Sequence, residues 1–580
     1  MTLRTVIVQE ATILRIISKA MLYSFLKVAK IYKKSFEKDL EYATQKNEQL
    51  LMEIIAKNSG TEYGKKYAFQ SIDSPKTFKN MVPLTQYEDY KDYIERMAKG
   101  EDNILTSEKV EYFGVSSGTT GSQKLIPVTK SSRKSISGYM GLLTQGVLYE
   151  NLSKKWTYGR GLNLIGMCGS GKTEGGIPTC SGTAGGMKSM EKMIPYIWTT
   201  PVEILKQDGK FDVNYLHLLF ALMDRDLMYL SAAFIPSILD LLRCLEDKWS
   251  ELIKDIREGE ISHEILVTED LRNKLQKRMK PNPERAEELE REFSVGMEGI
   301  VTRIWPKCAF IWGVSGAGFK MYLEKVKKYT SDLPVYCGTY GATEGLIGVE
   351  MGLNKATYVA APKSVYYEFI HEDEWDGKNI STYNIEELII GEKYEVVITN
   401  SAGFYRYRLG DVVKVVGYCG KTPELEFLYR KNQLISINAE KTSEQAVHQA
   451  VTETFKHLKL ELVDYTVMAD IDTSPGRYVF FAEVNNIKAL DKNEAERILE
   501  TKLCVANPRY EQFRKVMKIG HVSLELVKPG TFNSLKTLLV SKGASRNQVK
   551  IPRVVKRADL VELLKSKTYS TEVKEYIQIL

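Results

Sequence analysis

Apolar residues recur at helical spacing through the middle of the chain. The leucines that carry this pattern are Leu216, Leu219, Leu222, Leu227 and Leu230. Because residues three or four apart lie on one side of a helix, the pattern predicts long helices from residue 213 to 256. A second helical pattern covers residues 270–293 and breaks near Pro281 and Pro283, since proline interrupts a helix. This middle region is therefore predicted to be a helical layer.

Strand patterns follow the helical region. Residues 334–337 form a short run of strand-favouring types, and residues 387–399 and 404–418 are rich in Val, Ile and Tyr, with Gly and Asn at the breaks. We therefore predict strands and turns on both sides of Asp411.

The pattern changes again after about Arg430. It predicts helix, strand, strand and helix over residues 443–458, 460–469, 477–484 and 492–503. These elements fit a small α+β domain of roughly 150 residues, a common domain size. We place the boundary at the polar break beside Lys431, which predicts a large N-terminal domain over residues 1–431 and a small C-terminal domain over residues 432–580.

The composition excludes several classes of protein. The chain has 580 residues, 43% of them hydrophobic, enough for a large core and at least two domains. Its net charge of +7 is small for this length and its charges alternate in sign, so we expect no nucleic-acid partner. The seven cysteines are scattered without a CxxC pair, which favours reduced thiols in a cytoplasmic protein.

The first 36 residues are rich in Ile, Leu and Val but are interrupted by charged residues. No apolar run reaches the roughly 20 residues needed to cross a bilayer, so we expect no stable membrane insertion. We interpret the segment as an amphipathic helix packed on its own domain. The alternative is a helix on a membrane surface, which the basic cluster of Lys30, Lys33 and Lys34 favours.

The first chemical motif is a glycine- and hydroxyl-rich loop. It comprises Ser116, Ser117, Gly118, Thr119 and Thr120, with Gly121 and Lys124 close behind. Glycine lets several backbone N–H groups face one anion, and hydroxyls add donors to phosphate oxygens. The alternative is an ordinary surface turn. Strand-like residues 112–113 and 126–128 on either side predict a hairpin and hence an ordered loop.

The second motif is Tyr340, Gly341, Ala342, Thr343, Glu344 and Gly345. Its tyrosine can stack on a purine, and its small residues permit close approach of the backbone. Glu344 is a candidate Mg²⁺ ligand, because Mg²⁺ prefers carboxylate oxygens. The alternative is a strand-to-helix turn in which the threonine caps the helix.

The third motif is the segment from Tyr405 to Asp411, which places a carboxylate beside a strand, and Arg430 and Lys550 are further candidates for the same chemistry. Asp411 can accept hydrogen bonds from both ribose hydroxyls, and Arg430 can reach the same sugar; the alternative is a turn carboxylate. Lys550 precedes an Ile-Pro pair that stiffens the chain, so it can present a positive charge to a phosphoryl oxygen. The alternative is a solvated basic tail, since Arg553 and Lys556 follow.

Other catalytic motifs are incomplete. Residues 166–173 match the G-x-x-x-x-G-K-[ST] pattern, but the glycines and proline that follow Lys172 oppose the helix that a phosphate-binding P-loop requires. Residues 114–118 match G-x-S-x-G, yet a strand-like segment follows where a nucleophile elbow needs a helix. No HExxH sequence occurs, so a metalloprotease lacks support.

Together the three motifs, residues 529–532 and the closing segment from Gly543 to Arg553 resemble the Gretchen Hagen (auxin-responsive) family of acyl acid–amido synthetases. That family is a branch of the adenylate-forming enzymes, which include firefly luciferase and acyl-CoA synthetases. The resemblance covers nearly the whole chain. It implies an α/β fold whose large adenylation domain has mixed sheets, helical layers and a β-barrel-like part, followed by a small mobile α+β domain.

The resemblance also implies a two-step reaction that uses ATP and Mg²⁺. A carboxylic acid is adenylated, and an amino acid or other amine then displaces AMP. The loop from Ser116 to Thr120 is expected to hold phosphates, and the segment from Tyr340 to Gly345 adenine and the α-phosphate. Glu344 is expected to organise Mg²⁺, Asp411 and Arg430 the ribose, and Lys550 the adenylation step.

Two other functions remain open at this point. One is a thioester-forming acyl-CoA ligase on the same scaffold, and the other is a catalytically idle binding protein, against which the presence of Glu344, Asp411 and Lys550 argues. The glycine-rich residues 175–186 lack the bulky side chains expected around the acyl pocket of plant hormone enzymes. We expect a monomer whose partners are a small carboxylic acid and an amine.

Overall fold

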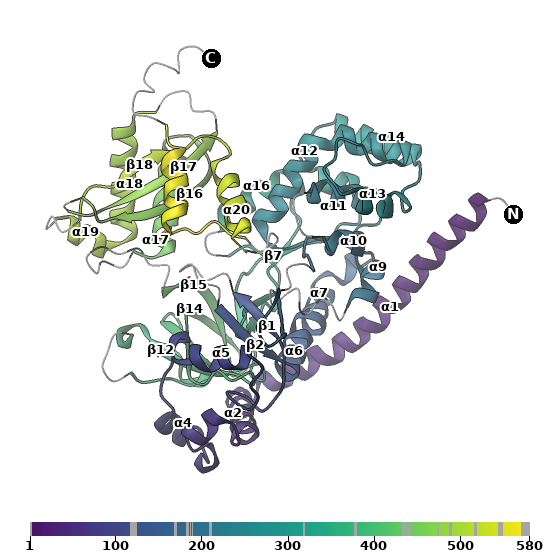
Figure 1. Ribbon diagram of the computed structural model, residues 1–580. Coiled ribbons are helices and arrows are strands. Elements are labelled where there is room, and N and C mark those ends of the chain that lie inside the picture. The colour runs from purple at the N-terminus through teal and green to yellow at the C-terminus, as the bar shows by residue number, and fades with distance from the viewer. Residues whose placement is uncertain are drawn as a thin grey trace. The chain divides into compact units, whose positions relative to one another are not determined.

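The computed structural model describes residues 3–116, 124–167, 171–180, 185, 187, 190–207, 211–316, 319–375, 380–431, 435, 437, 440, 442–473, 475–485, 490–515, 519–542, 544 and 549–569. The chain divides into two compact units (Figure 1). Unit 1 comprises Met1–Ser116, Leu125–Leu409 and Val413–Phe427, and unit 2 comprises Ser117–Lys124, Gly410–Val412 and Leu428–Leu580. The mixture of sheets and helices confirms the predicted α/β class.

A parallel sheet and its helices form one layer of unit 1. Its strand order is β3 (Gly161–Asn163), β6 (Tyr229–Phe234), β7 (Phe310–Val314) and β8 (Val335–Tyr336), and all its pairings are parallel. Parallel neighbours need crossover connections, which the helices α12 (Ile235–Glu258) and α16 (Lys320–Thr330) help to supply. Leucines of α12 pack with strand residues in one large buried cluster, so the core lies between helices and sheet.

The helical prediction for residues 213–256 is wrong in its centre. The chain there forms α11 (Val213–Leu222), then strand β6, then α12. Leu227 and Leu230 are fully buried but lie before and within a strand. Helix α12 begins beside Pro236, where proline is tolerated because the first helical N–H groups need no intrahelical partner. By contrast, α13 (Glu269–Gln276) and α14 (Pro283–Ser294) confirm the predicted break at the prolines.

Two further sheets, most of whose residues belong to unit 1, carry the motifs. A seven-stranded sheet has the order β12 (Tyr366–His371), β13 (Lys393–Thr399), β14 (Tyr407–Cys419), β15 (Thr422–Arg430), β11 (Tyr358–Ala360), β10 (Gly345–Val349) and β9 (Thr339–Ala342). It occupies the part of the chain that follows the helical layer and confirms the strands predicted around Asp411. A four-stranded sheet has the order β2 (Lys124–Thr129), β1 (Val110–Ser116), β5 (Pro178–Cys180) and β4 (Gly171–Lys172).

The N-terminal region is helical. Helix α1 spans Leu3–Leu40, and α2 spans Ala43–Asn58. Leu26, Ala29, Phe36 and Leu40 of α1 are buried, and Phe36 and Leu40 join a cluster with Tyr139 of unit 1. This packing confirms the predicted amphipathic helix. No helix among the described residues is both long and apolar enough to cross a membrane.

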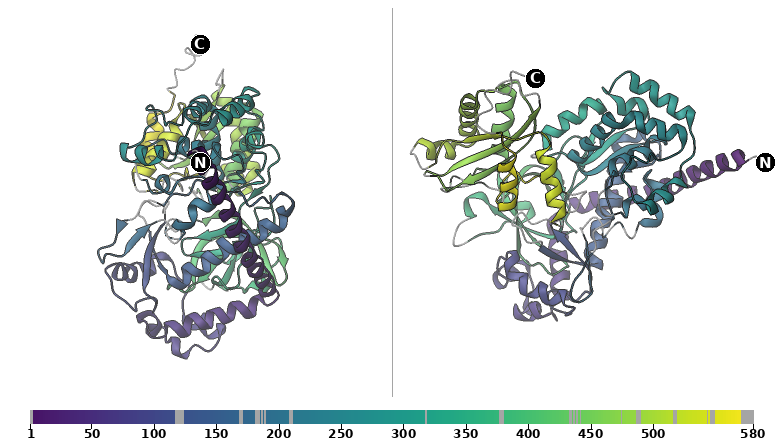
Figure 2. Two further views of the ribbon diagram at one scale, coloured as in Figure 1. Left: turned by 90° about the vertical axis from the view of Figure 1, so that its right-hand side faces the viewer. Right: turned by 45° about the horizontal axis from the view of Figure 1, so that its top comes forward.

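Unit 2 contains the predicted small α+β fold. Strands β16 (Glu461–Asp470) and β17 (Arg477–Asn485) pair antiparallel, and β18 (Ser523–Leu526) pairs parallel with β17. Helix α17 (Glu444–His457) begins at Ser443, whose side chain accepts a hydrogen bond from the N–H of Ala446 and so caps the helix. Together with α18 (Lys492–Ala506), these elements confirm the secondary structure predicted there. Figure 2 shows the two units from two further sides.

Helices α20 (Thr531–Ser541) and α21 (Ala558–Ser566) also belong to unit 2. Their apolar residues Phe532, Leu535, Leu560 and Leu564 share a buried cluster with Phe481 of β17. Among the described cysteines, six are free thiols: Cys180, Cys244, Cys308, Cys337, Cys419 and Cys504. Cys168 lies outside the described residues.

Candidate active site

The second motif is a β-hairpin. Tyr340, Gly341 and Ala342 lie in β9, Gly345 begins β10, and Thr343 and Glu344 form the turn between them. A strand-to-helix turn, the alternative considered for this motif, is therefore wrong. The hairpin places the hydroxyl and the carboxylate together at its tip.

Tyr340 is more enclosed than a purine platform requires. Its side chain is only 8% exposed and packs against Tyr358 and Phe427, with ring centroids 5.6 and 5.5 Å away. Gly341, the next residue, is exposed. The hairpin thus offers an accessible backbone, whereas the tyrosine ring mainly anchors the hairpin in the core.

Glu350 fixes the base of this hairpin. Its buried carboxylate accepts hydrogen bonds from the backbone N–H groups of Cys337, Gly338, Lys355 and Ala356. Burial raises the pKa of Glu350, and the four donors oppose that rise. Glu350 was not predicted from the sequence, because a single Glu after an apolar strand carries no signal of a backbone anchor.

The Glu344 turn is joined to the third motif. The Tyr407 hydroxyl lies 3.3 Å from Glu344 Oε1 and donates to it, and Asn400 Nδ2 donates to the Glu344 carbonyl at 2.6 Å. Asn400 Oδ1 in turn accepts from the N–H groups of Ala402 and Phe404. Glu344 itself is half-buried. Asn400 thus holds the backbone of Glu344, and Tyr407 holds its carboxylate. Asn400 was not singled out from the sequence, and Tyr407 was named only as part of the third motif.

The strand that carries the first motif also reaches this turn. Ser116 ends β1, while Ser117, Gly118, Thr119 and Thr120 lie outside the described residues. A Cβ placed on Gly114 of β1 would lie 2.5 Å from the Thr343 methyl carbon. Only glycine permits so close an approach, so β1 packs directly against the Thr343 side chain. Strands β1 and β2 are neighbours, as predicted, while the loop between them lies outside the described residues.

Tyr87 links β2 to the same region. Its hydroxyl accepts from the N–H of Leu125 at 3.0 Å and lies 3.3 Å from the Leu125 carbonyl oxygen. Burial raises the pKa of Tyr87, and the negative charge of Glu344 adds to the rise. Within unit 1, therefore, the ends of β1 and β2 and the Thr343–Glu344 turn converge.

Unit 2 brings the remaining candidates together. Asp411 in β14 is 1% exposed, and its Oδ1 forms an ion pair with Arg430 Nε at 2.5 Å. The side chain of Lys550 is open to water, yet desolvation by surrounding protein lowers the pKa of its amine. Arg430 acts in the same direction, whereas Glu444 and Asp411 oppose it. The three predicted residues therefore share one electrostatic environment.

The segment after Lys550 is attached to the edge of β16. The N–H of Val467 donates to the Arg553 carbonyl at 2.9 Å, and the N–H of Val555 donates to the Val467 carbonyl at 2.8 Å. Arg553 is 5% exposed, pairs with Asp464 at 2.5 Å, and lies over the Tyr465 ring. A solvated basic tail, the alternative interpretation, is therefore wrong for Arg553.

Glu444 was not identified from the sequence. It is the first residue of α17, and burial raises the pKa of its carboxyl, while Arg553 and Lys550 oppose that rise. A carboxylate in the first turn of a capped helix is a common feature, so its sequence signal is that of a helix start. In the structure, the negative charge of Glu444 acts on Lys550 and opposes the desolvation that lowers the pKa of its amine.

The two arginines of the third motif have structural partners. Arg406 pairs with the buried Glu368 of β12 at 2.8 Å, and Arg408 pairs with the buried Glu395 of β13 at 2.6 Å. A buried charge needs such a partner to offset its desolvation. These pairs hold the start of β14 against its sheet and so position Tyr407.

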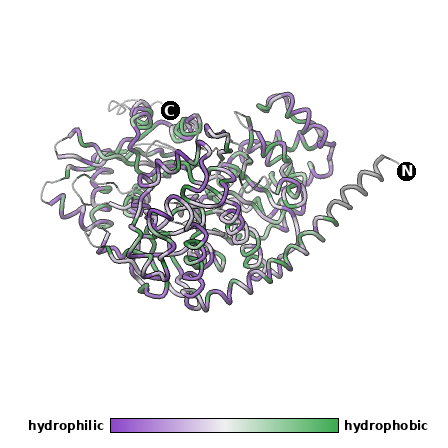
Figure 3. Tube along the Cα trace, turned by 60° about the horizontal axis from the view of Figure 1, so that its bottom comes forward, coloured by the Kyte–Doolittle hydropathy of each residue, from purple (hydrophilic) through white to green (hydrophobic). Residues whose placement is uncertain are grey.

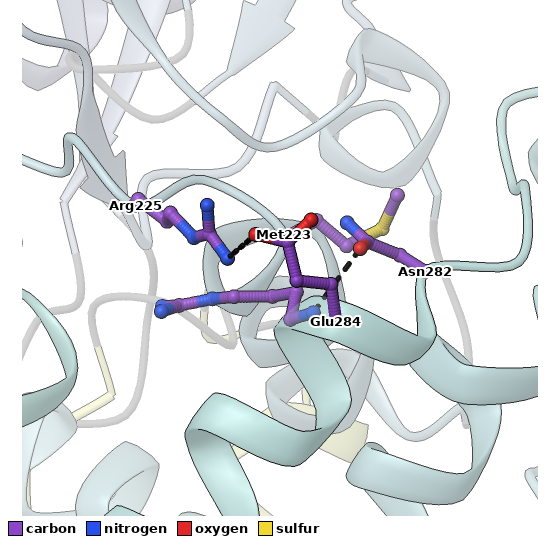
Figure 4. Close-up of a pocket in the computed structure, with 5 residues that line it drawn as sticks. Met223, Arg225, Asn282 and Glu284 are labelled. Carbon is purple, nitrogen blue, oxygen red and sulfur yellow. Dashed lines mark hydrogen bonds and ion pairs between the residues drawn. The ribbon is translucent and has the colours of Figure 1, made fainter.

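Other candidate sites are weaker. A surface pocket of unit 1 is lined by Met223, Arg225, Asn282, Glu284 and Arg285 (Figure 4). Arg225 pairs with Glu284 at 3.1 Å across it, and none of its lining residues belongs to the three motifs. Lys172 lies in strand β4 rather than at the start of a helix, which confirms that residues 166–173 are not a phosphate-binding P-loop.

Comparison with protein-family models identifies three successive domains. The N-terminal, central and C-terminal domain models of the GH3 family match residues 32–335, 358–430 and 445–559. The chain belongs to the GH3 family. This membership confirms the resemblance drawn from the motifs.

Relatives within the family align over almost their whole length. The jasmonoyl–L-amino acid synthetase JAR4 of Nicotiana attenuata is 33% identical, over 88% of this chain and 90% of its own. The 4-substituted benzoates–glutamate ligase GH3.12 of Arabidopsis thaliana is 30% identical, over 92% and 97%. The solved GH3.15 acyl acid amido synthetase is 28% identical, with a TM-score of 0.82 over 92% of this chain and 95% of that one.

Proposed function

We propose that this GH3 protein is an ATP-dependent acyl acid–amido synthetase. In the first step, a carboxylate oxygen of the acid attacks the α-phosphorus of ATP, and pyrophosphate leaves with the electrons of the broken P–O bond. In the second step, an amine attacks the acyl carbon of the adenylate. The C–O bond to AMP breaks, AMP leaves, and the amine loses a proton to form the amide.

The convergence around the Thr343–Glu344 turn supports this proposal most directly. It combines strand β1, which precedes the hydroxyl- and glycine-rich loop, with a carboxylate and a threonine side chain in unit 1. Phosphoryl transfer needs groups that position the reactants and stabilise charge at phosphorus. We assign Ser116, Ser117, Gly118, Thr119 and Thr120 to the phosphates.

The hairpin is assigned to the nucleoside and the reacting phosphate. The backbone of Tyr340, Gly341 and Ala342 is proposed to lie along adenine, because the Tyr340 ring is enclosed whereas Gly341 is exposed. Thr343 is proposed to donate its hydroxyl to the α-phosphate, and Gly345 to permit the tight turn.

Glu344 is proposed as the ligand that organises Mg²⁺. Its carboxylate offers hard oxygen donors, and Mg²⁺ bound to nucleotides commonly uses one or two carboxylates plus phosphates and water. Asn400 and Tyr407 hold the turn and so define where the carboxylate points. When bound, the metal would neutralise phosphate charge.

The charge cluster of unit 2 is proposed to serve the ribose and the adenylation step. Asp411 accepts hydrogen bonds from ribose hydroxyls, and Arg430 orients Asp411 through their ion pair. Lys550 supplies positive charge to a phosphoryl oxygen during adenylation. We propose that the unit containing Lys550 rotates between the two steps about a hinge near Lys431.

The substrates are proposed from the family. Relatives are named jasmonoyl–L-amino acid synthetase, indole-3-acetic acid–amido synthetase and 4-substituted benzoates–glutamate ligase. We propose that this chain likewise takes a small carboxylic acid and an amino acid or other amine. A monomer in the cytoplasm, as expected from the sequence, completes the proposal.

Acid-dependent exchange of labelled pyrophosphate into ATP tests the first step. The purified chain is incubated with Mg·ATP, labelled pyrophosphate and one acid at a time, beginning with jasmonic, indole-3-acetic and benzoic acids. We expect exchange with at least one acid and none without acid. If every acid fails while ATP still binds, as measured by calorimetry, the proposal is wrong for this set of substrates. If ATP does not bind at all, the nucleotide site itself is wrong.

A further inference from the structure

The outward face of helix α1 concentrates exposed apolar side chains. Among residues whose side chains are described, thirteen large hydrophobic residues are exposed. Four of these lie within residues 17–31: Ile17, Tyr23, Val28 and Ile31, with exposures of 47, 49, 51 and 70%. Isolated exposed apolar residues are normal on a soluble protein, whereas such a concentration marks an interaction surface.

Three of these residues form a stripe. Ile17 and Val28 are 11 residues apart, close to three helical turns, and Ile17 and Ile31 are 14 apart, close to four turns. Leu26, Ala29 and Phe36 of the same helix are buried, so the stripe lies opposite the face that packs on unit 1. Figure 3 shows apolar and polar positions alternating along the described part of α1.

The stripe is accompanied by positive charge. Between residues 17 and 40 the exposed charged residues are Lys19, Lys27, Lys30, Lys34, Lys38 and Glu37. Five exposed lysines therefore face solvent with one exposed carboxylate. Lys27 lies over the Tyr23 ring, and Lys30 over the Tyr149 ring, which orders their aliphatic stems along the helix surface.

The stripe lies before the region that matches the GH3 domain models, which supports a role separate from the proposed reaction. The match to the GH3 N-terminal domain begins at residue 32, and Ile17, Val28 and Ile31 all precede it. None of the proposed site residues lies on this helix. The face is therefore not accounted for by the proposed reaction.

We propose that this face of α1 binds an anionic lipid surface, with the helix lying in the plane of the interface. A basic helix with an apolar face has the two attractions that interfacial binding requires: burial of apolar side chains at the acyl boundary and attraction of lysines to anionic headgroups. In a two-fold pair of this chain, the lysine-rich faces would meet each other, so like charges oppose a second copy as the occupant.

Vesicle co-sedimentation of the full chain tests the proposal. The protein is mixed with phosphatidylcholine vesicles, either pure or containing about 30% phosphatidylserine, which makes the vesicle surface negative. We expect binding to the anionic vesicles, little binding to the neutral ones, and weakening as salt is raised through the range in which surface charges are screened. The double variant Val28→Asp/Ile31→Asp is expected to bind at least about tenfold more weakly.

Val295→Asp is the matched control. Val295 is a 75% exposed apolar residue at the end of α14, so its variant adds one charge to another surface of unit 1. We expect unchanged vesicle binding, and circular dichroism should show all variants folded. Pyrophosphate exchange should also be unchanged in the α1 variant, which separates this inference from the proposed reaction.

Two results would overturn the proposal. One is the absence of salt-sensitive binding to the anionic vesicles, or binding that the double variant leaves intact. The other is self-association that light scattering detects in the native chain and that the double variant abolishes without any vesicle binding. That second result would assign the face to another copy of the chain.

Discussion

The proposed Mg²⁺ site depends on the charge of one side chain, the carboxylate of Glu344. Its backbone carbonyl and its carboxylate each accept a hydrogen bond, from Asn400 and Tyr407. Removing the charge while keeping the size of the side chain therefore tests the chemistry with little change in packing.

Glu344→Gln is expected to lower the rate of pyrophosphate release at least about a hundredfold, which corresponds to about 2.7 kcal/mol of lost transition-state stabilisation. The amide keeps an oxygen that can accept from Tyr407 but offers a much poorer metal ligand. Release is measured at saturating Mg·ATP and acid. Glu372→Gln, which removes a surface ion pair with Lys393, is the control and should retain the native rate. Equal rates in the two variants would contradict the role of Glu344.

Lys550→Ala is expected to reduce adenylation strongly and to leave amide formation from a supplied acyl adenylate largely intact. The amine is proposed to act only on the phosphoryl group, so the second step does not need it. Lys556, an exposed lysine of the same segment, gives the matched control Lys556→Ala. Loss of both steps to the same degree in Lys550→Ala would show that its role is not confined to adenylation.

The pKa of Lys550 makes a separate prediction. Desolvation lowers it from the ordinary value of 10.5, and the protonated amine is the form that stabilises phosphate charge. Adenylation should therefore decline as pH rises through the lowered pKa, below the pH at which an ordinary lysine titrates. Lys550→Arg should remove this alkaline decline, because arginine stays protonated. A decline of the same position and size in the arginine variant would assign it to another group.

At the scale of elements, the segment Val549–Val555 is positioned by one buried ion pair and several backbone hydrogen bonds. Arg553 pairs with Asp464, donates to the Tyr465 carbonyl and continues the edge of β16. Lys550 stands three residues before it. The ion pair therefore belongs to the support of the proposed adenylation residue.

Arg553→Ala is expected to lower the free energy of unfolding by about 3–5 kcal/mol, since it leaves a buried carboxylate without its partner. Denaturant titration measures this loss, and Arg553→Ala/Asp464→Ala should recover part of it. Where the single variant remains folded, adenylation should fall more than amide formation. Arg514→Ala breaks the Glu500 ion pair in the same unit and should leave that ratio unchanged. A shift of the ratio in both variants would indicate general loosening of the unit.

The sequence predicts elements well where period and breakers agree. The prolines separate α13 from α14, and Ser443 marks the start of α17. It fails at β6, because Leu227 and Leu230 continue a helical spacing although Leu230 lies in a buried parallel strand and Leu227 in the buried segment before it. A fully apolar strand and a buried helix have the same composition, so tertiary packing decides between them.

In the candidate site, too, some residues can be predicted from the sequence and others cannot. Motifs identify residues whose chemistry is unusual for their position, such as Glu344 in a glycine-rich turn. They do not reveal Asn400 or Glu444, whose partners lie far away in the sequence, or Glu350, whose carboxylate binds backbone N–H groups of turns on either side of it. Such contacts exist only once the chain has folded, so an isolated Asn or Glu gives no signal.

At the scale of the whole molecule, the proposed reaction needs residues from both compact units. Ser116 and the hairpin from Tyr340 to Gly345 belong to unit 1, whereas Ser117–Lys124, Asp411, Arg430 and Lys550 belong to unit 2. The predicted boundary beside Lys431 remains a prediction, as does rotation about it. A hinge residue must change its backbone angles during the rotation. Substitution of Lys431 by proline, which fixes φ, therefore tests the proposed hinge directly.

Lys431→Pro is expected to slow overall amide formation about tenfold or more, while pyrophosphate release in the first turnover changes less. Proline restricts the backbone through which the proposed rotation passes. Rapid-quench measurement of the first turnover, set against the steady-state rate, separates the two steps. Lys431→Ala retains a free backbone and should behave like the native chain. Equal slowing of both steps by proline would place the hinge elsewhere or remove the need for one.

The central claim is that this chain joins an activated acid to an amine. The most direct measurement is the product balance with Mg·ATP and an acid that supports pyrophosphate exchange, with and without a mixture of amino acids. The account predicts pyrophosphate, AMP and an amide in equal amounts, with the amide detected by mass spectrometry only when an amino acid is present. Continuous AMP formation that requires coenzyme A and yields a thioester, with no amide from any amino acid, would contradict it.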